Sequence, residues 1–225
     1  MEKVSARKDF IPMSKIVVSR TAYRFTPLMH VNHPEAMAQL SEGHPYDVST
    51  NIFERLPQIF FDEKPADGKE YIRILGRTDN NRIYKYVRRD YIRPVCNLDS
   101  YKVFLSKANG TGEFGETLTA PFVGEPETGN TETFISIGQL GSLYEAEALV
   151  KYIKTRFVRS LLGALKTTQD ITPEKWQYVP MQNFTPVSDI DWSLSVNDID
   201  ELLYTKYALT ANERDFVRKK VQKME

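Results

Sequence analysis

The chain has 225 residues, enough for one domain with a substantial core, and its 30 Lys and Arg balance its 30 Asp and Glu. This balance excludes a protein that is basic all over, and the single cysteine, Cys96, excludes an internal disulfide and cysteine-rich zinc sites. No apolar run approaches the roughly 20 residues that a membrane span requires, and no signal peptide is recognisable. We therefore expect a cytoplasmic protein without membrane contact.

The charges are nevertheless segregated along the chain. Basic residues outnumber acidic ones over residues 71–93, and acidic residues predominate over residues 170–201. A neutral protein with segregated charge can present a basic face to a polyanion.

The N-terminal part predicts one strand and a long loop. Residues 16–18 are apolar and β-branched, which favours a buried strand. The proline-rich stretch that follows contains all three histidines and predicts a long surface loop. His30 and His33 have a spacing that suits metal ligands on a helix, but Pro34 disfavours a helix at that point. We therefore predict no metal site there.

A hairpin is predicted in the basic region. Residues 58–61 and 71–76 favour strands, and Asp79-Asn80-Asn81 is typical of a tight turn into a further strand over residues 82–87. Basic and apolar residues alternate along that last strand.

The alternation places Arg82, Lys85 and Arg88 on exposed edges of the hairpin. A solvated strand face is the simplest interpretation. A two-stranded ribbon also has the right width for a DNA groove, where Asn80, Asn81 and the arginines could reach base edges.

A glycine-rich loop is predicted after the next strand, residues 101–106. The three glycines within residues 110–115 match the dinucleotide-binding fingerprint in spacing, but residues 117–122 favour a strand where the fingerprint requires a helix. The better interpretation is a flexible loop whose polar tips are Lys107 and Asn109.

A strand and a long helix come next. Residues 134–137 favour a strand that ends at Gly138, and Ser142 with Glu145 has the form of a capping box. No proline interrupts the chain from Glu145 to Lys166, and an apolar stripe at helical spacing predicts one long, largely buried helix. A basic strip, either a solvated edge or a surface that faces DNA phosphates, lies on its opposite side. The basic strip comprises Lys151, Thr155, Arg159 and Lys166.

The C-terminal part predicts a short strand over residues 176–180, a connecting loop over 184–192 and two amphipathic helices. Ser195 caps the first helix, and Thr210 with Glu213 forms a capping box for the second. This tail packs either on the same domain or on a partner.

Catalytic signatures are nearly absent. Asp67-Gly68-Lys69, with Asp47 or Asp62 upstream, is the one formal match to a metal-dependent nuclease, and it lies in a turn sequence. No nucleophile setting, phosphate-binding lysine loop or adenine-methyltransferase motif is recognisable. We predict no catalytic centre in this chain.

Ordered pieces over most of the chain resemble a known family. These pieces are Val18-Ser19-Arg20 with Tyr23 and Phe25, and residues 101–108, 131–134, 145–148, 152–159, 166–170, 176–184, 190–193 and 200–207. Together they are similar to the C-terminal target-recognition region of bifunctional restriction–modification enzymes and related adenine-specific DNA methyltransferases.

The resemblance implies a domain that reads a DNA sequence for methylation or cleavage carried out elsewhere. The methyltransferase and nuclease parts are absent, so the chain is either a fragment or a separately encoded specificity subunit. S-adenosylmethionine and magnesium are then expected only in the catalytic partner, with no cofactor in this chain.

These observations predict a mixed α+β fold: a mostly antiparallel sheet packed with one long helix, plus a helical C-terminal tail. We expect a DNA target-recognition domain over residues 1–192 and the tail over 193–225. The predicted function is sequence-specific recognition of double-stranded DNA. The alternatives are a metal-dependent nuclease that uses Asp47, Asp67 and Lys69, and a subunit whose tail docks a methyltransferase.

The predicted DNA-binding residues fall into two groups, because phosphate contacts position a protein and base contacts specify the sequence. Phosphate contacts are expected from Arg82, Lys85, Arg88, Lys107, Arg156, Arg159 and Lys166. Base contacts are expected from Arg20, Arg24, Arg77, Asn80, Asn81, Asn109 and Gln169.

Overall fold

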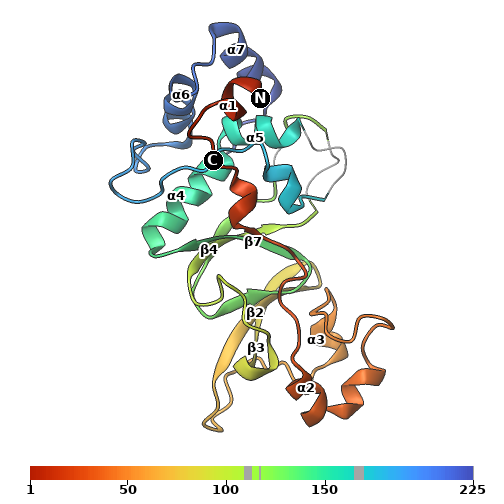
Figure 1. Cartoon of the computed structure of the whole chain (residues 1–225). Helices are drawn as coiled ribbons and strands as arrows, with labels where there is room; N and C mark the ends of the chain where they lie inside the picture. Colours follow the sequence, from red (N-terminus) through yellow and green to blue (C-terminus); the bar gives the residue numbers. More distant parts are fainter. Residues whose placement is uncertain (109–112, 117, 165–169, 225) are drawn as a thin grey trace.

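The computed structural model describes residues 1–108, 113–116, 118–164 and 170–224. The fold is α+β, as predicted, but its strands form two sheets instead of one. The molecule is elongated, with most of the longer helices at one end, the sheets in the middle and short helices beside the second sheet at the other end (Figure 1). In the described part of the chain, no helix is both long and apolar enough to cross a membrane.

The first sheet is antiparallel, and the second contains one parallel pair. The first has the order β1 (Val17–Val18), β7 (Phe134–Leu140), β4 (Tyr101–Ser106) and β5 (Phe122–Gly124). The second has the order β3 (Asn81–Arg88), β2 (Tyr71–Thr78) and β6 (Thr128–Asn130), with β6 parallel to β2.

The long helix predicted from Glu145 onward is two helices. They are α4 (Leu143–Lys154) and α5 (Arg156–Gly163), and Thr155 between them has an extended ψ of 146°. The Thr155 hydroxyl donates to the Tyr152 carbonyl and accepts from the Val158 N–H, so this residue ends one helix and caps the next. The prediction of one continuous helix was wrong because a helix can be interrupted without a proline.

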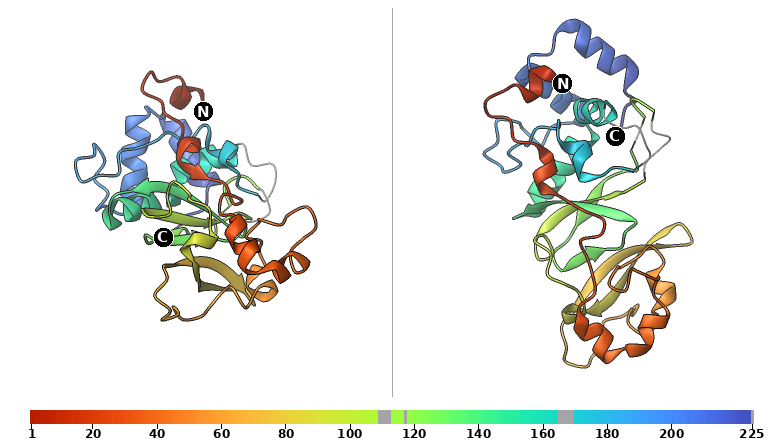
Figure 2. Two further views of the ribbon diagram at one scale, coloured as in Figure 1. Left: turned by 60° about the horizontal axis from the view of Figure 1, so that its bottom comes forward. Right: turned by 45° about the vertical axis from the view of Figure 1, so that its right-hand side comes forward.

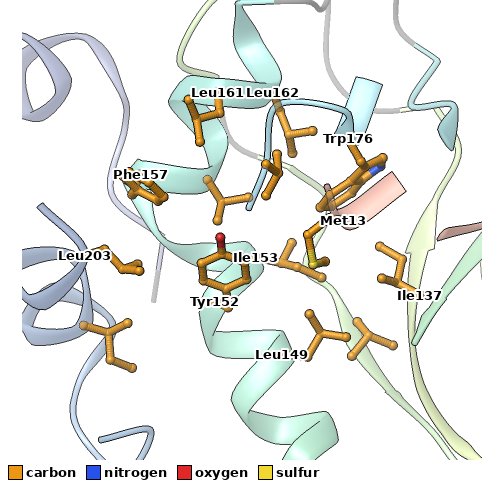
Figure 3. Packing of buried hydrophobic residues seen from close by; sticks show 14 of the residues in the cluster. Met13, Ile137, Leu149, Tyr152, Ile153, Phe157, Leu161, Leu162, Trp176 and Leu203 are labelled. Atoms are coloured by element: carbon orange, nitrogen blue, oxygen red, sulfur yellow. The ribbon is translucent and has the colours of Figure 1, made fainter. Parts of the chain in front are cut away.

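The C-terminal helices pack on α4 and α5, so the tail belongs to the same hydrophobic core. They are α6 (Val196–Lys206) and α7 (Ala211–Lys220), and Ser195 and the Thr210–Glu213 capping box begin them as predicted. Figure 3 shows the packing, in which Tyr152 and Phe157 lie between Leu203 of α6 and the side chains around Trp176.

The segment predicted as a long surface loop is a second small core. It contains α2 (Pro27–Asn32) and a 3₁₀ turn at Pro34–Ala38, which lie beside the second sheet together with the following α3 (Ile52–Arg55) (Figure 2). Met29, Ile52 and Phe60 are buried there against β2. The loop prediction was wrong because the elements are too short to show a helical period.

Other strand predictions need smaller corrections. Ile16 belongs to a 3₁₀ turn, Phe61 makes only an isolated bridge to Tyr86, and Trp176 ends another 3₁₀ turn. In the described part of residues 117–122, only Phe122 belongs to a strand. Strand β7 continues through Gly138, whose φ of +91° lets the backbone bend without ending the ladder. The remaining short helices are α1 (Glu2–Ser5) and the 3₁₀ turns Met13–Ile16, Arg89–Tyr91 and Pro173–Trp176.

A fully buried lysine holds the two sheets together. The Lys102 ammonium on β4 donates to the carbonyls of Leu98 at 2.9 Å, Glu125 at 3.3 Å and Thr128 at 2.9 Å. Three carbonyls match its three N–H groups. Burial lowers the pKa of Lys102 to about 7.

The lowered pKa predicts a pH dependence of stability. The pKa of an unfolded lysine is about 10.4, as in model peptides. The unfolded chain therefore binds more protons than the folded chain between about pH 7 and pH 10, and the free energy of unfolding rises with pH across that window. We expect the wild type to gain about 2 kcal/mol between pH 7 and pH 9 in urea denaturation. The Lys102→Met variant should lack that gain, and equal gains in both proteins would contradict the assignment.

Candidate nucleic-acid interface

The β2–β3 hairpin has a tight turn and a free end. Thr78 pairs with Asn81, which leaves Asp79 and Asn80 as a two-residue turn, with φ of +48° and +63°. Two successive positive φ values define a type I′ turn, and Asn and Asp tolerate that conformation better than most residues. The predicted turn is confirmed.

The third strand supports only the base of this hairpin. β6 pairs with β2 from Arg73 to Leu75 and no further, so the hairpin continues as a two-stranded ribbon. Gly76 lies against Phe53 of α3, where an added Cβ would come within 2.3 Å of the ring. Beyond that contact the end of the hairpin projects (Figure 2, right), although the Arg82 side chain still contacts Phe122 of the first sheet and the Ala120 carbonyl.

Two arginines face each other on this projecting ribbon. Arg77 and Arg82 are direct cross-strand partners, and like charges in that position repel. The Arg82 guanidinium lies 4.0 Å from the centre of the Phe122 ring and donates to the Ala120 carbonyl at 3.3 Å. The buried Nε of Arg77 has no hydrogen-bond partner among the described residues.

Neither arginine is neutralised by an acid: the ion pairs of the described chain include no carboxylate for Arg77 or Arg82. Burial and then the charge of Arg77 lower the pKa of Arg82. Two cations held side by side without a counter-ion create a positive potential that attracts anions and hydrogen-bond acceptors.

Four other predicted DNA-binding side chains are neutralised internally. Their ion pairs are Arg20–Glu132 at 3.8 Å, Arg24–Asp47 at 3.0 Å, Lys85–Asp62 at 2.7 Å and Arg88–Asp90 at 2.5 Å. Arg88 also stacks on Tyr91. A phosphate has to compete with a carboxylate for each of these side chains, so they are weaker candidates than the hairpin pair.

Within the described part of the basic strip predicted on the helix, Thr155 and Arg159 are buried and Lys151 is half-buried. The Arg159 side chain is buried and donates to the carbonyls of Lys154 and Gln222, and burial lowers its pKa to about 10. Arg156 donates to the Val221 carbonyl, and Lys151 donates to three carbonyls from Trp192 to Leu194. Arg159 is therefore a weak candidate for the predicted phosphate contact, because its guanidinium is buried and donates to backbone carbonyls between the helices.

The remaining predicted side chains divide between the hairpin tip, the end of β4 and the part of the chain that is not described. Asn80 and Asn81 are exposed at the tip, and the Asn81 side chain donates to the Asp79 carbonyl. Lys107 is half-buried just after β4. Asn109, Lys166 and Gln169 lie outside the described residues.

Phe122 is the interface residue that the sequence did not indicate. It follows Arg82 by some forty positions on a different strand, so no local pattern relates the two side chains. Only the packing of the second sheet on the first brings them together.

The residues of the nuclease alternative make hydrogen bonds and ion pairs within the protein. The Asp67 carboxylate accepts from the Lys69 N–H at 3.1 Å and from the Tyr71 hydroxyl, which stabilises its own turn. Asp47 is bonded to Arg24 and His44 instead. Among the described residues no three His, Cys, Asp or Glu side chains are grouped so that they could hold a metal.

No protein-family model, curated protein or solved structure matches the chain.

Proposed function

We propose that this chain binds double-stranded DNA in a sequence-specific manner, with the free end of the β2–β3 hairpin as its principal contact. The observation that carries the proposal is the unneutralised Arg77–Arg82 pair on a projecting two-stranded ribbon. A β-ribbon fits the DNA major groove, and arginines are the residues most often found on phosphates and guanine edges.

The resemblance noted in the sequence supports a role in restriction–modification. We propose that the chain directs methylation or cleavage that another domain or subunit carries out. S-adenosylmethionine and magnesium then belong to that catalytic partner, and this chain contributes the DNA contacts.

The charge pattern predicts an unusual salt dependence. Most basic side chains around the hairpin already have acidic partners, so only a few phosphates can be neutralised on binding. Each neutralised phosphate contributes about −0.9 to the slope of log affinity against log salt, so we expect a slope of about −2 to −4. A uniformly basic binder has a much steeper slope.

The test is a titration of duplex affinity from low to physiological salt, with single-stranded DNA of the same sequence as the comparison. The proposal predicts duplex binding with the shallow slope and weaker single-strand binding. Absence of duplex binding at low salt would refute it and would favour the docking-subunit alternative.

A further inference from the structure

We propose that Arg82 is a specificity-determining residue that reads a guanine in the major groove by donating to O6 and N7. This inference rests on the proposed DNA-binding function and deepens it, because it names the base and the side chain.

The free ribbon has the length that a major groove requires. Pairing with β6 stops at Leu75, and β2 continues for three residues to Thr78 before the turn. At about 3.3 Å per residue, this part extends about 10 Å past the third strand. The major groove is roughly 8.5 Å deep and 12 Å wide, so a ribbon of this length can enter it, and Arg82 would reach the base edges together with Phe122, on which it is stacked.

Arg82 is held in place before any ligand binds. Its guanidinium stacks on Phe122 at 4.0 Å and uses one donor on the Ala120 carbonyl. A guanidinium has five N–H donors in a rigid fork, so most of them stay available. An ordered fork loses little entropy on binding, which favours bidentate recognition over the looser contact that a mobile lysine makes with a phosphate.

The charges around Arg82 favour a base edge over the sugar-phosphate backbone. Asp79 is exposed at the tip of the same ribbon, and its carboxylate would be repelled by phosphates. Inside the groove, the same carboxylate can accept from a cytosine N4 amino group. Arg77, directly opposite, adds a second positive charge that attracts phosphates as well as guanine edges, so the repulsion between Asp79 and phosphates supplies the preference.

The experiment has two stages and uses the complete chain. DNA retained by the wild type from a randomised duplex library is sequenced, and the selection is repeated with Arg82→Met and with Arg88→Met as a matched control. Arg88 lies on the same strand at the far end of the hairpin and is paired with Asp90. Affinities are then measured for the selected duplex with each motif guanine replaced in turn by 7-deazaguanine, which lacks the N7 acceptor.

The proposal predicts that Arg82→Met loses the guanine preference at one motif position by about 10- to 100-fold, whereas Arg88→Met keeps the motif. The 7-deaza substitution at that position should weaken wild-type binding about tenfold and leave Arg82→Met unchanged. A wild-type motif that Arg82→Met retains in full would overturn this inference alone. A wild type that enriches no motif would overturn both the inference and the proposed function.

Discussion

Replacing both Arg77 and Arg82 with alanine should lower the affinity for a selected duplex by at least about 30-fold, since each good arginine contact to DNA contributes about 1–3 kcal/mol. The two guanidiniums are the unneutralised cations of the projecting ribbon, so little else on the hairpin can replace them. Fluorescence anisotropy at fixed salt measures the change.

The stability of the double variant should stay within about 1 kcal/mol of the wild type. Alanine removes the stacking of Arg82 on Phe122 but also the repulsion between the two cations, and each effect is of the order of 0.5–1 kcal/mol. Lys85→Ala is the matched control, because Lys85 is on the same strand and paired with Asp62. We expect less than about a threefold loss of affinity for it. A loss as large as that of the double variant would show that internal pairing does not decide which cations meet DNA.

Replacing Asp200 with alanine should destabilise the whole domain by about 2–6 kcal/mol, because each of two buried N–H groups left without an acceptor costs about 1–3 kcal/mol. The Asp200 carboxylate on α6 is buried and accepts from the backbone N–H groups of Arg156 and Phe157, both at 2.9 Å. It therefore caps α5 from a neighbouring helix, and alanine leaves both N–H groups without a partner.

Urea denaturation at pH 7.5 measures this loss, since burial raises the pKa of Asp200 to about 6 and the carboxylate is charged above that value. Asp200→Asn keeps one acceptor and should cost about half as much as alanine. One cooperative transition is expected in each variant, because the helices after residue 193 share the core of α4 and α5. Unfolding of α6 and α7 at a lower urea concentration than the sheets would contradict this account and would support an independently folded tail.

Local signals explain what the sequence predicted correctly. The Asp79-Asn80 turn, the Ser195 cap and the Thr210–Glu213 capping box each depend on residues within four positions of one another, and the structure confirms all three. The fold class follows in the same way from the strand and helix patterns.

Contacts between residues that are distant in the sequence explain the predictions that were wrong. Asp200 stabilises the break at Thr155 from 45 positions away, and Arg159 is withdrawn from the surface by carbonyls near the C-terminus. Neither arrangement leaves a periodic pattern in the sequence.

For the candidate site too, local sequence signals were sufficient for some features and contacts between distant residues decided the others. Charge counts placed the basic residues on the hairpin, but a basic residue is available to DNA only if no carboxylate already holds it. Lys85 and Arg82 are indistinguishable in the alternating sequence, and only the structure shows that Asp62 neutralises the first while Phe122 orders the second.

The most direct test of sequence-specific recognition by the hairpin is to sequence the duplexes retained from a randomised library by the wild type and by the Arg77→Ala, Arg82→Ala double variant. We predict that the wild type enriches one short motif and that the double variant enriches none, while both proteins remain folded. No enrichment by the wild type, or the same motif in both proteins, would contradict the account.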